Sequence, residues 1–263
     1  MTLEVLICTF NERVKNVGQV FLPQRADVSY LVAYQYDRDE LAGLAHEVVE
    51  QRSDVRVVCT RGRGLSANRN RALQEARGDL LLIADDDVRY EPLFFDRILL
   101  RFATEQAPDI ACYQAECPDG RLLKPYAYHS FDYREQPRGT YFSSVEIVMK
   151  RSERLPRFDE RFGLGSDFLE GGEEEVFLFE AAQRGLTIRY YPEVIVVTDP
   201  ATTGSRLLTS KALQRTKGAV LCRMHGPIGA WMRCLKYVAT QSSRPFSLNL
   251  LWEMTRGIRY VMK

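Results

Sequence analysis

Three consecutive aspartates, Asp85, Asp86 and Asp87, follow the apolar run from Leu80 to Ala84. The run predicts a buried strand that carries three carboxylates to the edge of a sheet. Neighbouring carboxylates repel one another, so their joint ionisation is costly unless a cation lies between them. A hard divalent ion such as Mg²⁺ or Mn²⁺ takes oxygen ligands and shares them with phosphates. The triplet therefore favours a metal-bound nucleotide diphosphate, although a solvated strand end or a helix cap would show the same residues.

A second acidic cluster, Glu173–Glu175, follows two glycines and opens an apolar helical pattern that ends at Gly185. Glutamates in a first helical turn interact favourably with the helix dipole, so helix formation alone also explains the cluster. Helical spacing places Glu174 on one face with Phe177 and Leu178. We therefore expect Glu174 to point inward, where an ionised carboxylate can accept a proton as a general base.

The elements that position these residues alternate along the chain. Strand-like runs lie at 3–8, 29–35, 55–59 and 79–84, and helical patterns lie at about 13–22, 38–52, 66–77 and 92–106. This alternation predicts βαβ units and a mostly parallel sheet. Strand-like pieces at 110–117, 121–128 and 140–149 predict a smaller antiparallel or mixed extension. Open α/β sheets bind ligands beyond the carboxyl ends of their strands, so Cys8–Asn11, Gln35 and the aspartates should converge there.

Length and composition are those of an ordinary globular protein. The 263 residues, with 45% hydrophobic content, suffice for one large domain or for one domain with an appendage. The N-terminal residues lead directly into Val5–Cys8 without a basic segment and a long apolar run, so we expect no secretory signal and a cytoplasmic location. The six cysteines lack paired zinc-ligand spacing.

Charge is distributed unevenly. Residues 201–263 contain eleven Lys or Arg and one acidic residue, Glu253, whereas residues 1–200 contain 25 basic and 34 acidic residues. Large apolar residues such as Trp231 and Trp252 interleave with the basic ones, which suits peripheral contact with an anionic membrane. Amphipathic helices that pack on the main domain or on a second subunit would show the same pattern. No nucleic-acid-reading module accompanies the charge, so we expect no nucleic-acid partner.

Four segments carry a family resemblance when taken in order. They are Ile7–Arg13, Gly64–Leu73, Ala84–Asp87, and Phe162–Gly165 with Gly172–Glu174. Together they resemble family-two glycosyltransferases of the GT-A fold over about residues 1–205, and residues 206–263 form a separate basic amphipathic region. The resemblance implies a three-layer, Rossmann-like α/β fold with a mostly parallel sheet, a small antiparallel extension and a helical C-terminal tail. The aspartate triplet corresponds to the metal-binding DXD motif of that family.

The same resemblance implies roles for individual residues. The nucleoside would be bordered by Thr9, Asn11, Arg69 and Asn70, and the ribose and phosphate positions would be held by Asp85 and Asp86. The ligand of Mg²⁺ or Mn²⁺ would be Asp87. On the acceptor side, Glu174 would activate the acceptor hydroxyl, with Gly172 and Glu173 beside it. Structural explanations compete with these roles, because Asn11 can cap a helix and Arg69 can form a surface salt bridge.

Two positions depart from the family pattern. Many relatives place an aspartate after the second strand to bind the nucleotide base, whereas this chain has Gln35, a neutral hydrogen-bonding side chain. Relatives often carry a histidine near the metal, just after the strand that corresponds to Val194–Val197 in this chain. Here Asp199 takes the position of that histidine. A carboxylate suits Mg²⁺ or Mn²⁺ at least as well as an imidazole, so we expect metal binding to be kept, with a shift in preference towards Mg²⁺.

The sequence thus predicts a metal-dependent glycosyltransferase that moves a sugar from a nucleotide diphosphate, with a UDP-sugar as the expected donor. The expected acceptor is a hydroxyl of a glycan or lipid-linked glycan in surface polysaccharide synthesis. One carboxylate base without a covalent nucleophile favours single displacement with inversion. Two alternatives stay open: a nucleotidyltransferase that makes sugar nucleotides, which would show a glycine-rich basic loop after the first strand, and a non-catalytic sugar-binding relative.

Overall fold

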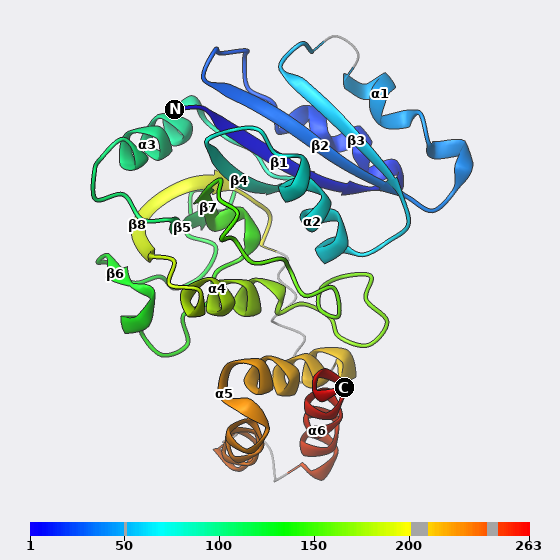
Figure 1. Cartoon of the computed structure of the whole chain (residues 1–263), viewed down its shortest axis with the longest axis vertical. Coiled ribbons are helices and arrows are strands. Elements are labelled where there is room, and N and C mark those ends of the chain that lie inside the picture. The colour runs from blue at the N-terminus through cyan, green and yellow to red at the C-terminus, as the bar shows by residue number, and fades with distance from the viewer. Residues whose placement is uncertain (50–51, 201–209, 241–246) are drawn as a thin grey trace. The chain divides into compact units, whose positions relative to one another are not determined.

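The computed structural model describes residues 1–49, 52–200, 210–240 and 247–263 (Figure 1). The chain divides into two compact units. The first, here called the sheet unit, contains Met1–Arg63, Ala67–Arg157 and Glu180–Pro200. The second, here called the helical unit, contains Gly64–Ser66, Phe158–Phe179 and the described part of Ala201–Lys263. A boundary near residue 205 between an enzymatic domain and a basic tail stays a prediction.

The sheet unit contains an eight-stranded sheet with the order β3-β2-β1-β4-β7-β5-β8-β6 (Figure 1). Its strands are β1 (Leu3–Phe10), β2 (Val28–Tyr36), β3 (Val55–Arg61), β4 (Leu80–Asp85), β5 (Ile110–Glu116), β6 (Phe131–Asp132), β7 (Ile147–Lys150) and β8 (Ile188–Val197). β1 to β4 are parallel, β7 runs antiparallel between β4 and β5, and β8 is parallel to β5. The predicted mostly parallel α/β sheet with an antiparallel extension is confirmed.

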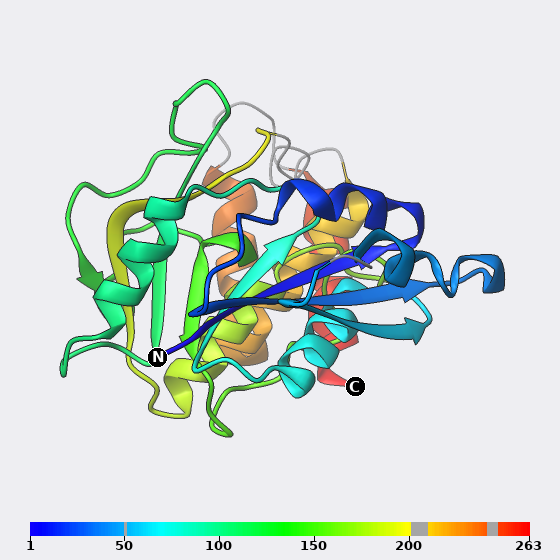
Figure 2. The same ribbon diagram turned by 90° about the horizontal axis from the view of Figure 1, so that it is seen from above.

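Helices cover both faces of this sheet. They are η1 (Asn11–Gln19), η2 (Asp39–Leu41), α1 (Leu44–Val49), α2 (Leu65–Glu75), α3 (Pro92–Phe102), η3 (Tyr133–Glu135) and η4 (Ser144–Glu146), where η denotes a 3₁₀ helix; α4 (Glu173–Gln183) has residues in both units. Figure 2 shows η1 and α2 on opposite faces of the β1–β3 part of the sheet. Alternate β1 residues, Leu3, Val5 and Ile7, are fully buried in one core cluster with residues of η1, α1 and α3.

The predicted strand at 121–128 is wrong. In this segment the structure contains one isolated bridge, between Glu116 and Leu122, after a turn in which Gly120 has a φ of 81°. The turn forms because glycine adopts a positive φ without steric cost. The backbone amide of Ala115 donates a 3.0 Å hydrogen bond to the hydroxyl oxygen of Tyr126, so this segment follows β5 without forming a regular ladder.

Two long elements, α5 (Lys211–Thr240) and α6 (Leu248–Met262), dominate the helical unit. Gly226 has a φ of 68°, and Pro227 follows it, so α5 consists of two helical segments joined at a kink. The two helices approach closely at glycines. A Cβ atom built on Gly218 would lie 2.0 Å from the carbonyl oxygen of Met254, and one on Gly257 would lie 1.9 Å from that of Arg215.

The substitution Gly257→Ala is expected to lower the free energy of unfolding by about 1–3 kcal/mol, because the new methyl group forces two helix backbones apart. Urea unfolding followed by circular dichroism measures this effect. Gly18→Ala is the matched control, since a Cβ atom at Gly18 meets nothing within 4 Å. Equal unfolding midpoints for the two variants would show that α5 and α6 do not pack through these glycines.

Candidate active site

The carboxyl ends of β1, β2 and β4 meet at one edge of the sheet. The parallel register pairs Phe10 with Gln35 and Cys8 with Asp85. Thr9 and Gln35 are buried there, at 3% and 5% exposure. Burial raises the pKa of the Cys8 thiol to about 12, so this cysteine stays protonated and is a packing residue. The sheet therefore brings together the residues of these three strand ends as predicted.

Asp86 is the buried member of the aspartate triplet and is hydrogen-bonded to the end of β1. Its carboxylate accepts a 2.6 Å hydrogen bond from the hydroxyl of Thr9 and bonds from Nε and Nη2 of Arg13. The residue is 2% exposed, and burial raises the pKa of its carboxyl while the bonds from Arg13 and Thr9 oppose that shift. Asp86 thus ties the end of β1 and the start of η1 to the triplet.

Asp87 differs from Asp86 in its exposure. Its side chain is 48% exposed, and Oδ2 accepts a 2.8 Å ion-pair bond from Nη2 of Arg13. Arg13 is itself about half exposed and bridges both carboxylates. A positive charge therefore lies between neighbouring aspartates, as their mutual repulsion requires.

The end of β8 approaches the triplet. Arg89 and Val197 form an antiparallel bridge with two backbone hydrogen bonds of 2.9 Å. Because the two segments run in opposite directions, Asp87, two residues before Arg89, and Asp199, two residues after Val197, extend towards the same side of that bridge. Asp199 is exposed. Among the described residues, no group of three or more His, Cys, Asp or Glu side chains is arranged to hold a metal ion.

Asn11 turns the chain at the end of β1. It is the only residue other than glycine with a positive φ in the described chain, at 50°. Its Nδ2 donates a 2.8 Å bond to Asp37, and its Oδ1 accepts a 3.1 Å bond from the amide of Asp37. Asparagine tolerates this left-handed conformation better than most residues, and such strained positions cluster at functional sites. These two bonds hold the end of β1 beside the end of β2, close to Gln35.

The N-terminal half of α2 carries three consecutive buried polar side chains, and contacts of the first two reach this edge. Asn68 donates bonds of 3.2 and 2.8 Å to the carbonyl oxygens of Thr9 and Ala33, which fixes α2 to two strand ends. Arg69 is 2% exposed, and its Nη2 lies 3.4 Å from Asp85. Asn70 is 4% exposed. The alternative of a surface salt bridge at Arg69 is therefore wrong, since the guanidinium is buried against the triplet.

The position of Arg69 is also fixed by a hydrogen bond to a residue far away in the sequence. The Ser144 hydroxyl accepts a 2.6 Å bond from Nη2 of Arg69. Ser144 lies in η4, where the backbone amide of Ser143 donates a 2.8 Å bond to the carboxylate of Glu146, as in one half of a capping box. Glu146 is fully buried and also accepts a 2.8 Å bond from Lys124 and one from the Tyr126 hydroxyl. Sequence reasoning missed this support, although the spacing of Ser143 and Glu146 is a recognisable capping signal.

If Arg69 binds the donor, as the family resemblance implies, substituting Ser144 by alanine should raise the KM for the donor roughly tenfold with a smaller change in kcat, because Arg69 would lose a charge-assisted bond that fixes its position. Steady-state kinetics on the purified variant measure both constants. Ser130→Ala, at an exposed serine, serves as the control and should leave both unchanged. An unchanged KM in Ser144→Ala would mean that Arg69 needs no support from η4.

The acidic cluster of α4 lies in the helical unit and differs from the prediction in one respect. Glu173 is buried, at 3% exposure, whereas Glu174 is only partly buried. The prediction that Glu174 points inward in preference to Glu173 is therefore wrong. Val176, Phe177 and Leu178 are all buried, so this helix is covered on several sides and helical spacing alone does not select one inward carboxylate.

Two glycine-rich segments shape the start of α4. Gly171 and Gly172 have φ values of 80° and 82°, and Gly172 lies so close to α5 that a Cβ atom would be 2.7 Å from Val220. Gly163 lies over Glu173, because its Cβ atom would be 3.2 Å from the Glu173 carboxyl carbon. Gly163 and Gly172 need glycine for both conformation and space, whereas Gly171 needs it for conformation alone. In the same turn, burial raises the pKa of Glu175, an effect that the charge of Lys217 opposes.

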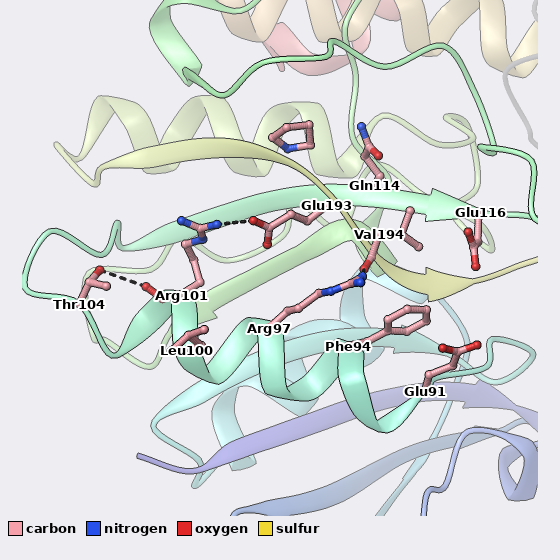
Figure 3. Close-up of a pocket in the computed structure, with 11 residues that line it drawn as sticks. Glu91, Phe94, Arg97, Leu100, Arg101, Thr104, Gln114, Glu116, Glu193 and Val194 are labelled. Carbon is pink, nitrogen blue, oxygen red and sulfur yellow. Dashed lines mark hydrogen bonds and ion pairs between the residues drawn. The ribbon is translucent and has the colours of Figure 1, made fainter.

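A pocket of about 730 Å³ lies between α3 and β8 (Figure 3). The β5–β8 register moves from Cys112–Tyr190 to Gln114–Val194, so β8 bulges around Pro192 and leaves room beside α3. Both arginines of the pocket have partners within the protein. Arg97 donates a 3.0 Å bond to the carbonyl oxygen of Val194, and Arg101 forms an ion pair with Glu193. No predicted site residue lines this pocket.

Comparison with known proteins decides the family. The model of glycosyl transferase family 2 matches residues 4–153, more than half of the chain. The chain belongs to glycosyl transferase family 2. It is therefore a glycosyltransferase, and the matched segment includes the aspartate triplet, Thr9, Asn11, Gln35 and the Arg69–Asn70 pair.

Solved structures support the fold of this glycosyltransferase. The crystal structure of S. aureus TarS 1–349 is similar with a TM-score of 0.63 and 14% identity, over 98% of this chain and 81% of that chain. The same TarS segment in complex with UDP-GlcNAc gives a TM-score of 0.62 at 13% identity, over 100% and 81%. The chain covers 45% of the longer S. aureus TarS structure. No curated protein matches the sequence. At these identities the likeness shows the fold alone.

Proposed function

We propose that this enzyme transfers a sugar from a nucleotide diphosphate, with a UDP-sugar as donor, to a hydroxyl group of a glycan or lipid-linked glycan. The observation that carries the proposal is the convergence of the aspartate triplet with Thr9, Gln35 and Arg69 at one sheet edge. Open α/β folds bind nucleotides at this edge. TarS in complex with UDP and with UDP-GlcNAc supports a uridine donor.

The donor would lie along the strand ends. We assign Asn11 and Gln35 to the base, because both carry neutral amide groups beside the β1 and β2 termini. Arg69, Asn70 and Asp85 would border the ribose and the diphosphate. Asp86 would act through Arg13, which its carboxylate holds in place. A guanidinium suits the diphosphate, since it donates hydrogen bonds in a fixed fork.

Asp87 and Asp199 fit a hard divalent ion. Both offer exposed carboxylate oxygens near the Arg89–Val197 bridge, and oxygen ligands are those that Mg²⁺ and Mn²⁺ prefer. The protein would supply two ligands and leave the remaining positions to diphosphate oxygens and water. Such an ion, when bound, offsets negative charge on the departing diphosphate.

Glu174 is the proposed general base. Its carboxylate would take the proton of the acceptor hydroxyl while that oxygen forms a bond to the anomeric carbon and the diphosphate leaves with the electron pair of the broken bond. One base without a protein nucleophile gives a single displacement, hence inversion. Gly172 and Glu173 would shape the acceptor side, because the buried Glu173 and the left-handed glycines fix the start of α4.

The acceptor is proposed to be lipid-linked, as in surface polysaccharide synthesis, and held at the inner face of a membrane. The basic region 206–263 would make the peripheral contact. Within the described part of the chain, no helix combines the length and the apolar character needed to cross a bilayer.

A panel of nucleotide sugars, incubated with the protein and Mn²⁺, tests the proposal. Slow donor hydrolysis that releases a nucleoside diphosphate is expected from a transferase in the absence of acceptor. Exchange that depends on pyrophosphate would indicate a nucleotidyltransferase, and the absence of any reaction would indicate a non-catalytic sugar-binding protein. Either of these results would overturn the proposed function.

A further inference from the structure

The second segment of α5, residues 227–240, exposes an apolar stripe. Ile228 is 77% exposed, Trp231 47%, Met232 59% and Leu235 39%. Their spacing of three, four and seven places them on one side of the helix. The side that packs within the helical unit is formed by other residues, Ala230, Cys234 and Val238, all of which are buried. The stripe is therefore additional to the apolar surface that the fold itself uses.

A similar but shorter row lies on α6. Leu248 is 72% exposed and Trp252, four residues later, is 56% exposed. The guanidinium of Arg259 lies 5.9 Å from the ring centroid of Trp252. Trp231 and Trp252 are the two tryptophans of the whole sequence. Tryptophan with a neighbouring cation is typical of helices that lie at the boundary between lipid and water.

The charges beside the stripe are positive. Arg233 and Lys236 are exposed on the same segment of α5. Glu253, the one acidic residue of 201–263, is buried and is bound by Arg215 at 2.6 Å and by Arg256 at 3.0 Å. The negative charge of Glu253 is thus neutralised by Arg215 and Arg256 inside the helical unit. It does not offset the positive charge beside the exposed stripe.

We propose that residues 227–240 lie on an anionic membrane surface, with Ile228, Trp231, Met232 and Leu235 inserted between the lipid headgroups. A second copy of this chain is the other candidate for covering the stripe. Pairing the stripe with itself would bring Arg233 and Lys236 of both copies together, whereas anionic lipid attracts them. This inference rests on the proposed function for the lipid-linked acceptor, but membrane binding itself is measured without turnover.

Intrinsic fluorescence tests the inference directly, because both tryptophans lie on the exposed rows. Titration of the full chain with phosphatidylglycerol vesicles is expected to shift the emission to shorter wavelength and to bring the protein down with sedimented vesicles. Phosphatidylcholine vesicles should produce a much smaller effect, and raised salt should weaken binding to phosphatidylglycerol. No shift with either lipid, or equal binding to both, would overturn the proposal.

Variants locate the surface. The double variant Ile228→Ser with Met232→Ser is expected to weaken vesicle binding roughly tenfold or more, because two inserted side chains are lost. Arg233→Glu with Lys236→Glu should weaken binding to phosphatidylglycerol by a similar factor. The controls are Leu100→Ser, at a side chain 73% exposed on α3, and Arg138→Glu, at an exposed loop arginine. Equal losses in the controls would contradict a localised membrane face.

Two further outcomes separate the alternatives. A shift that depends on protein concentration without vesicles, together with a dimer in light scattering that Ile228→Ser with Met232→Ser dissociates, would assign the stripe to a second copy and reject the membrane proposal. Donor hydrolysis is expected to be unchanged in that variant, because neither residue belongs to the proposed site. Vesicle binding without donor hydrolysis in the wild type would keep the membrane face and reject the proposed function.

Discussion

Replacing Glu174 by glutamine is expected to lower the rate of sugar transfer by about 10²–10⁴-fold, the range that a general base contributes. The amide keeps the size of the side chain and removes its ability to take a proton from the acceptor hydroxyl. Donor binding should stay within about twofold of the wild type, because the proposed base would act on the acceptor. Transfer kinetics and calorimetric titration with UDP measure the two effects separately.

Glu175→Gln is the matched control for this variant. It changes the neighbouring carboxyl of the same helical turn, whose pKa burial raises, and should leave transfer within a few-fold of the wild type. Full activity in Glu174→Gln together with a large loss in Glu175→Gln would move the base to Glu175. Large losses in both variants with unchanged unfolding midpoints would mean that the turn as a whole supplies the negative charge.

Replacing Asp87 by asparagine is expected to reduce transfer by on the order of a thousandfold, because charge on the leaving diphosphate would no longer be offset by a bound ion. Chelation with EDTA should produce a similar loss in the wild type, and added Mn²⁺ or Mg²⁺ should restore it. The same addition should not restore Asp87→Asn. Rates measured across a metal titration test both expectations.

The control for Asp87 is Asp96→Asn, which removes a carboxylate that is 56% exposed and pairs with Arg25. Its activity and metal dependence should match the wild type. Asp199→Asn is expected to weaken metal affinity with a smaller loss of rate, since Asp87 would remain. Metal-independent transfer in the wild type would contradict the assigned roles of both aspartates.

The sheet was predictable from local patterns. The run Leu80–Ala84 is apolar and ends in aspartates, so both the strand and its polar end follow from the sequence. The same holds for β1 and β2, which is why Thr9, Gln35 and the triplet were expected at one edge. Parallel pairing of neighbouring strands then brings those residues together without further information.

Other features depend on contacts that local spacing does not encode. Ser144 and Arg69 are 75 residues apart and meet because β7, which follows η4, pairs with β4 and β5. Helical spacing likewise failed at Glu173 and Glu174, because segments distant in sequence cover several sides of α4. Burial of Glu253 was equally invisible, although it determines which charges of the C-terminal helices remain exposed.

A crystal structure with a UDP-sugar and Mn²⁺ tests the proposed mechanism most directly. The expected result is a manganese ion shared by Asp87 and the diphosphate, with the carboxylate of Glu174 facing the anomeric carbon from the side opposite the leaving group. A diphosphate bound away from Asp87, or Glu174 turned to bulk solvent on another side of the molecule, would contradict it.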